Sequence, residues 1–135
     1  MLGMMGDHDI EGQFAQILRF FLSPTWEELW DDMGLSVVTF ASLGLSVNSS
    51  DVLVWHTCQE KQVILVTGNR NHESPDSLES AIRRYNRADS LPVFTIGNLR
   101  AFSLKRSYAE RAAEKLLEYL SEIDRFRGTG RLYIP

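Results

Sequence analysis

Apolar residues follow two different spacings in this chain, and the two spacings alternate from one end to the other. Short, nearly continuous apolar runs predict β-strands at 2–6, 35–40, 62–67, 91–96 and 131–134. Apolar residues three and four positions apart predict helices at 10–21, 23–34, about 51–61, 74–85 and 108–123. Strands that alternate with helices pair in parallel, because a helix supplies the crossover that a parallel pair needs. The pattern therefore predicts an α/β protein with three α/β/α layers and a mostly parallel sheet of four to five strands.

Length and composition predict one ordinary globular domain. The chain has 135 residues, of which 44% are hydrophobic and 24% are charged, and this balance excludes a disordered or fibrous protein. No uncharged apolar run is long and continuous enough to span a bilayer, and no signal peptide is evident. The single cysteine, Cys58, excludes an internal disulfide and fits a reducing compartment. We therefore expect a protein of the cytoplasm with no membrane partner.

Charge is distributed unevenly along the chain. Residues 1–69 hold two basic and nine acidic side chains, whereas residues 70–106 hold seven basic and four acidic ones. The basic group includes Arg70 and, within two turns of a predicted helix, Arg83, Arg84 and Arg87. These arginines are candidates for contact with a phosphodiester backbone, and the alternative is pairing with acids of the same helix.

Oxygen-bearing side chains follow several of the predicted strands. Asp7 comes directly after the first strand, Asn69 and Asn71 follow the third, and Asp51 begins the helix that precedes the third. The carboxyl ends of parallel strands meet at one edge of a sheet, and that edge is where such folds bind ligands. Carboxylate and amide oxygens suit Mg²⁺ or Mn²⁺, so we expect a site for one of these ions there.

Three short motifs in this order resemble the PIN-like domains, a family of small α/β/α nucleases that includes toxins of bacterial toxin–antitoxin pairs. The motifs are GDHDI at 6–10, SDVL at 50–53 and VILVTGNRN at 63–71. The resemblance covers roughly residues 3 to 99. It implies a single PIN-like domain over 1–135, with a helical insertion near 23–34 and an added C-terminal helix near 106–124.

The resemblance also implies a function. It makes the protein a weak Mg²⁺- or Mn²⁺-dependent endoribonuclease in which metal-activated water cleaves phosphodiesters. Asp7 and Asp51 would be the catalytic, metal-binding carboxylates, with Asn69 as a further ligand. Arg70 and Asn71 would bind the substrate RNA. No Gly-rich phosphate loop is present, so no nucleotide cofactor is expected.

One departure from the family pattern opens a second interpretation. Asn69 and Asn71 stand where the family usually carries aspartates, and the loss of two negative charges weakens Mg²⁺ binding. The alternative is a catalytically impaired PIN-like scaffold that acts as a protein-interaction or dimerisation module. An exposed face with Trp26 and Trp30 would make the homodimer or partner contact.

Each candidate residue also has a structural interpretation. Asp7 and Asp51 are both placed to stabilise a helix N-terminus, and Asn69 and Asn71 are typical of turns. A receiver-like signalling domain is a third hypothesis, disfavoured because no aspartate ends the third strand. His56 and Cys58 are predicted to pack in the core.

Overall fold

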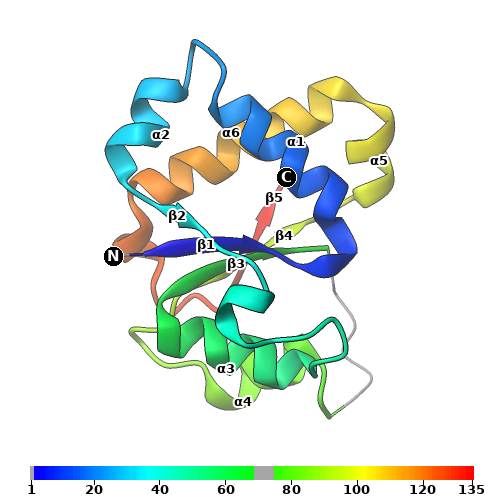
Figure 1. Ribbon diagram of the computed structural model, residues 1–135, viewed down its shortest axis with the longest axis vertical. Coiled ribbons are helices and arrows are strands. Elements are labelled where there is room, and N and C mark those ends of the chain that lie inside the picture. The colour runs from blue at the N-terminus through cyan, green and yellow to red at the C-terminus, as the bar shows by residue number, and fades with distance from the viewer. Residues whose placement is uncertain (1, 69–74) are drawn as a thin grey trace.

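The computed structural model describes residues 2–68 and 75–135 as one α/β domain built on five parallel strands (Figure 1). The strands are β1 (Gly3–Gly6), β2 (Ser36–Val37), β3 (Val63–Thr67), β4 (Val93–Ile96) and β5 (Arg131–Ile134). The α-helices are α1 (Glu11–Phe21), α2 (Glu27–Met33), α3 (Asp51–Lys61), α4 (Leu78–Tyr85), α5 (Leu99–Leu104) and α6 (Arg106–Ser121). Three short 3₁₀ helices are η1 (His8–Ile10), η2 (Ala41–Leu43) and η3 (Ile123–Phe126).

The sheet has the strand order β2-β1-β3-β4-β5, and every neighbouring pair is parallel. β3 lies at its centre between β1 and β4, and these three strands are mostly buried on both faces. Strands that are covered by helices on both sides have this burial pattern, because neither face meets water. The predicted three-layer α/β/α fold with a mostly parallel sheet is therefore confirmed.

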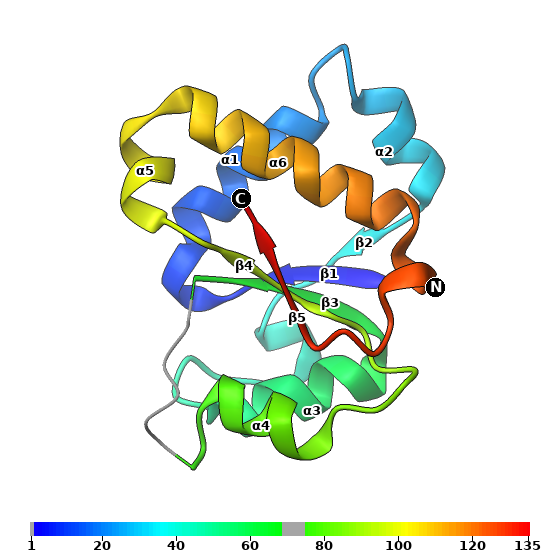
Figure 2. The ribbon, with the colours of Figure 1, turned by 180° about the vertical axis from the view of Figure 1, so that it is seen from behind.

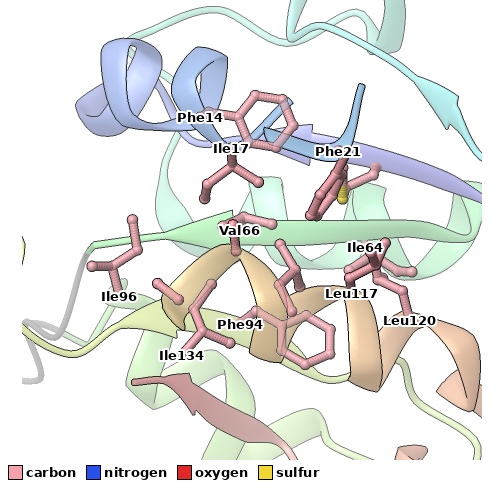
Figure 3. Packing of buried hydrophobic residues seen from close by; sticks show 14 of the residues in the cluster. Phe14, Ile17, Phe21, Ile64, Val66, Phe94, Ile96, Leu117, Leu120 and Ile134 are labelled. Atoms are coloured by element: carbon pink, nitrogen blue, oxygen red, sulfur yellow. The ribbon is translucent and has the colours of Figure 1, made fainter. Parts of the chain in front are cut away.

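Two hydrophobic clusters cover the two faces of the sheet (Figure 2). On one face α1, α2, α5 and α6 pack against the sheet, and Figure 3 shows side chains of α1 and α6 meeting those of β3, β4 and β5. On the other face α3 and α4 pack side by side against the sheet. Successive strand residues alternate between the clusters: Ile64 and Val66 face the first, whereas Val63 and Leu65 face the second.

The last crossover differs in hand from the other three. The β1–β2, β2–β3 and β3–β4 connections are right-handed, as expected for parallel strands (Figure 1). The β4–β5 connection advances in the same direction as β3–β4. Its helix α6, however, packs on the α1 face and not on the α4 face. This last connection is therefore left-handed, which is rare.

Most predicted elements are found, with four main differences. The helix predicted at 23–34 begins only at Glu27 and has no side-chain cap. β2 covers only Ser36–Val37 of the predicted run 35–40, and both residues are exposed at the edge of the sheet. α5 was not predicted; its N-terminus is capped by the Asn98 side chain, which accepts a hydrogen bond from the Ala101 amide at 2.9 Å. The helix expected from residue 74 begins at Leu78, where Ser77 is the cap.

The predicted exposed tryptophan face is wrong. Trp30 is buried and its ring lies 5.0 Å from that of Phe21, while half-buried Trp26 stacks on Phe20. Both tryptophans pack against the core, and only Trp26 is partly exposed, so they do not form the exposed pair that was predicted. His56 was predicted to be buried but is exposed, whereas Cys58 is buried as expected. No helix in the described ranges is both long and apolar enough to cross a membrane.

Candidate functional site

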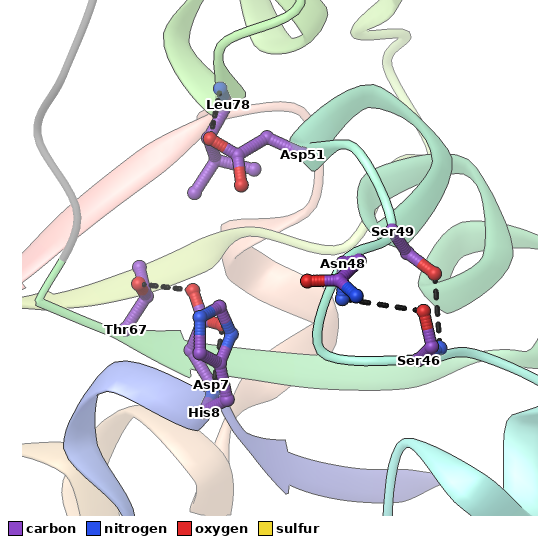
Figure 4. Close-up of polar contacts among 8 residues, drawn as sticks. All are labelled: Asp7, His8, Ser46, Asn48, Ser49, Asp51, Thr67 and Leu78. Atoms are coloured by element: carbon purple, nitrogen blue, oxygen red, sulfur yellow. Dashed lines mark hydrogen bonds and ion pairs between the residues drawn. The ribbon is translucent and has the colours of Figure 1, made fainter.

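Asp7 lies at the carboxyl end of β1 with its carboxylate buried beneath the surface. Only 5% of the residue is exposed. One oxygen, Oδ2, accepts a hydrogen bond from the Thr67 hydroxyl at 2.8 Å, which joins the ends of β1 and β3 (Figure 4). The other, Oδ1, accepts from the His8 amide at 2.8 Å and lies 3.1 Å from His8 Nδ1. Asp7 therefore caps η1 and also binds the neighbouring strand.

The position of Asp7 in the sheet is the one where ligands bind in such folds. From β1 the chain crosses to β2 over one face, and from β3 it crosses to β4 over the other face. The two crossovers diverge here, and in such folds ligands bind outside the carboxyl ends of the strands at this point. Asp7 and Thr67 end these two strands.

Asp51 reaches the same edge from a different element. It begins α3 behind Ser50, whose side chain accepts a hydrogen bond from the Leu53 amide at 3.2 Å. Asp51 Oδ2 accepts from the Leu78 amide at 3.3 Å (Figure 4). The carboxylate thus binds an amide at the N-terminus of α4 and connects two neighbouring helices.

Three predicted site residues, Asn69, Arg70 and Asn71, lie outside the described residues. Within the described ranges, no group of three or more His, Cys, Asp or Glu side chains is arranged to hold a metal ion. Asp7 and Asp51 provide hard oxygens of the kind that Mg²⁺ prefers, but they are only two. The oxygen ligands among the described residues are of the type that the predicted ion prefers, but there are too few of them to complete a site.

Two groups near Asp7 respond to its charge. Partial burial of the Asp9 carboxyl, and then the charge of Asp7, raise the pKa of Asp9, although the residue as a whole is exposed. His8 and backbone hydrogen bonds, including one to Gly68, lower this pKa. Burial, and then Asp7, raise the pKa of the Cys58 thiol to about 12. Cys58 is therefore a thiol at neutral pH and not a nucleophile.

Thr67 is the contact that the sequence interpretation missed. Its hydroxyl is fully buried and bonds to the Asp7 carboxylate. The signal was present, since a polar residue ends an otherwise apolar strand in the motif at 63–71. A buried hydroxyl needs a partner, and the neighbouring strand end supplies it.

Two of the predicted basic residues lie far from this edge. Arg84 and Arg87 line a pocket at the carboxyl end of α4, whereas Asp51 contacts the amino end of that helix. Arg83 pairs with Glu79 at 3.6 Å on the same helix. None of these three arginines is therefore placed to hold a phosphate beside Asp7.

Comparison with known proteins gives no match: no family model, no curated protein and no solved structure matches this chain.

Proposed function

We propose that the protein is a PIN-like protein of nuclease ancestry that acts in the cytoplasm as a weak Mg²⁺- or Mn²⁺-dependent ribonuclease. The supporting observation is the buried carboxylate of Asp7 at the divergence of the β1 and β3 crossovers. A carboxylate buried at a ligand-binding edge is a common feature of functional sites.

In this proposal Asp7 and Asp51 are the charged ligands of the ion, and Asn69 adds a neutral oxygen. Thr67 and His8 hold the Asp7 carboxylate in one orientation through its two oxygens. The ion would supply polarisation of the phosphate and activation of the attacking water. Arg70 and Asn71 are assigned to the phosphate of the RNA.

A second candidate function is the catalytically impaired scaffold that binds a protein partner or a second copy. Two observations favour it. Both carboxylates already make structural hydrogen bonds, Asp7 to Thr67 and Asp51 to the Leu78 amide. In addition, the described residues add no third ionisable ligand to this pair.

Calorimetric titration with Mn²⁺ separates the two functions. We expect the wild type to bind Mn²⁺, and Asp7→Asn and Asp51→Asn to lower the affinity roughly tenfold or more, since each removes a ligand charge. The asparagine variants keep an oxygen for the Thr67 hydroxyl and the Leu78 amide, and circular dichroism checks their fold. Asp124→Asn, an exposed acid outside this edge, is the matched control.

Absence of Mn²⁺ binding by the folded wild type would overturn the nuclease proposal and leave the scaffold. If Mn²⁺ does bind, cleavage of a single-stranded RNA is measured with wild type and Asn69→Asp. We expect the added charge in Asn69→Asp to increase both Mn²⁺ affinity and cleavage.

A further inference from the structure

The pocket that Arg84 and Arg87 line lies at the amino-terminal ends of the strands, on the opposite side of the molecule from Asp7. It is formed by the carboxyl-terminal parts of α3 and α4 and by residues that precede β3 and β4, including Gln62 and Ser90. Its volume is about 490 Å³. Small-molecule sites of proteins have volumes in this range. We call it the α3–α4 pocket; Figures 1 and 2 show the two helices side by side beneath the sheet.

Aromatic side chains form one wall of the α3–α4 pocket. The rings of His56 and Tyr85 contact each other edge to face with centroids 4.5 Å apart, and the ring of Trp55 lies 6.4 Å from that of Tyr85. Tyr85 is 39% exposed, although it is a large aromatic residue. An exposed ring supported by neighbouring rings is a suitable surface for stacking a planar base.

Charged side chains of both signs line the same pocket. Arg84 and Arg87 flank Tyr85, and neither guanidinium has an ion-pair partner within the described residues. Glu60 and Asp89 also line the pocket. A ligand that satisfies both signs carries an anionic group for the arginines and hydrogen-bond donors for the carboxylates. A phosphate together with the amino group of a base meets both requirements.

The pocket wall also contains unsatisfied polar atoms. Trp55 is 3% exposed, and its indole Nε1–H has no hydrogen-bond acceptor among the described residues. Asn86 donates from Nδ2 to the Gly128 carbonyl at 2.8 Å, but its buried Oδ1 accepts no hydrogen bond in the described part of the chain. Buried groups without partners are uncommon in native proteins. Both atoms are closed to solvent, so they are not direct contacts for a ligand in the pocket.

We propose that the α3–α4 pocket binds a nucleotide, with the base stacked on Tyr85 and the phosphate bound by Arg84 and Arg87. The pocket has no Gly-rich loop, so recognition depends on stacking and on the two guanidinium groups. A free nucleotide and an unstacked nucleotide of a single-stranded RNA present the same chemistry. The proposal does not depend on the Asp7 site.

Binding of AMP, measured by calorimetry, tests the proposal. We expect Arg84→Gln and Arg87→Gln each to weaken AMP binding about fivefold to tenfold. Tyr85→Leu is expected to weaken it about tenfold through loss of stacking, whereas Tyr85→Phe, which keeps the ring, retains the wild-type affinity. Arg83→Gln is the matched control, because it removes the same charge from the same helix outside the pocket. We expect this variant to stay within about twofold of the wild type.

Adenosine and inorganic phosphate are titrated as partial ligands, and both are expected to bind more weakly than AMP. An oligoadenylate of eight nucleotides distinguishes the two possible ligands. Tighter binding than AMP indicates that the pocket binds single-stranded RNA, and equal or weaker binding indicates that it binds a free nucleotide. Absence of binding for both AMP and the oligonucleotide would overturn the proposal, as would an equal loss in Arg83→Gln and Arg84→Gln. AMP binding by Asp7→Asn is expected to equal that of the wild type, so the two proposals can fail separately.

Discussion

Asp7 illustrates how one buried carboxylate can serve structure and chemistry together. Its two oxygens accept hydrogen bonds from Thr67 on one side and His8 on the other. Each carboxylate oxygen has two lone pairs, so these bonds orient the group without using all of its acceptor sites. An oriented, buried carboxylate is what a metal ligand requires, and the same bonds also stabilise the ends of β1 and β3.

Asp9 provides a test of the electrostatics around Asp7. In the folded state its pKa is raised, mainly by burial of the carboxyl and then by the charge of Asp7. The protonated form is therefore favoured on folding, and the associated stability is lost as the pH rises through the raised pKa. Asp9→Asn replaces the ionisable carboxyl at this position with a neutral amide. Because Asp9 is an exposed residue and solvent screens its charge, we expect only a small rise in Tm at pH 7, of about 1 °C.

The pH dependence of the Asp9→Asn effect is its internal control. Below the ordinary aspartate pKa of 3.8, Asp9 is protonated in both the folded and the unfolded state. The advantage of the variant should then disappear. Thermal unfolding of both proteins between pH 3.5 and about pH 7 measures the difference. A constant difference across this range would show that charge is not its cause.

At the scale of elements, a partly buried ion pair attaches the last strand to a helix. Arg131 of β5 lies 3.0 Å from Glu79 of α4 through Nη2, and it donates from Nη1 to the Thr95 hydroxyl of β4. The Arg131 side chain is only 8% exposed. Removal of the Glu79 carboxylate would leave the buried charge of Arg131 without its ion-pair partner, which lowers the stability of the folded state.

We therefore expect Glu79→Ala to lower the free energy of unfolding by about 2–3 kcal/mol. Glu110→Ala, which breaks the exposed pair with Arg106, is the control and is expected to cost less than about 1 kcal/mol. Urea denaturation measures both variants. Equal effects of the two substitutions would mean that burial of Arg131 does not strengthen the ion pair.

The elements that the sequence predicted well are those with a strong local pattern. The run VILVT gives β3, and the regular apolar stripe gives α6. β2 is much shorter than predicted: only Ser36 and Val37 pair with residues of β1 at the edge of the sheet. α5 has six residues, too few to show a helical period, and its Asn98 cap lies only two residues after the predicted strand at 91–96.

The candidate site was predictable only in part for a related reason. The position of Asp7 after an apolar strand follows from local pattern. The bond from Asp51 to the Leu78 amide joins residues 27 positions apart, and no local pattern encodes it. The α3–α4 pocket also depends on the packing of two helices against each other, so no local pattern in the sequence shows that Arg84 and Arg87 line a pocket.

At the scale of the whole molecule, polar groups gather at both ends of the parallel strands. The carboxyl edge carries Asp7 and Asp51, and the amino edge carries the α3–α4 pocket. The apolar clusters between them span both faces of the sheet. The two proposed sites are therefore separated by packed core, and substitutions at one should leave binding at the other unchanged.

The left-handed β4–β5 crossover makes the docking of β5 a property of the complete fold. Such a connection is disfavoured, so long-range contacts have to hold the strand in place. Ile134 is the last residue of β5 and is fully buried in the hydrophobic cluster that α6 covers. The Tyr108 hydroxyl donates to the Pro135 carbonyl at 2.6 Å and fixes the chain end to α6.

Ile134→Ala should therefore destabilise the whole protein and not only its last strand. Loss of the buried side chain leaves a cavity, and we expect a decrease of about 2–4 kcal/mol in the free energy of unfolding. Tyr133→Ala is the control: Tyr133 is the preceding residue of β5, is 48% exposed, and should cost less than about 1 kcal/mol. A single cooperative urea transition for Ile134→Ala, shifted to lower urea, is the expected result. An unshifted transition would show that the domain folds without docking of β5, and that the left-handed connection adds nothing to its stability.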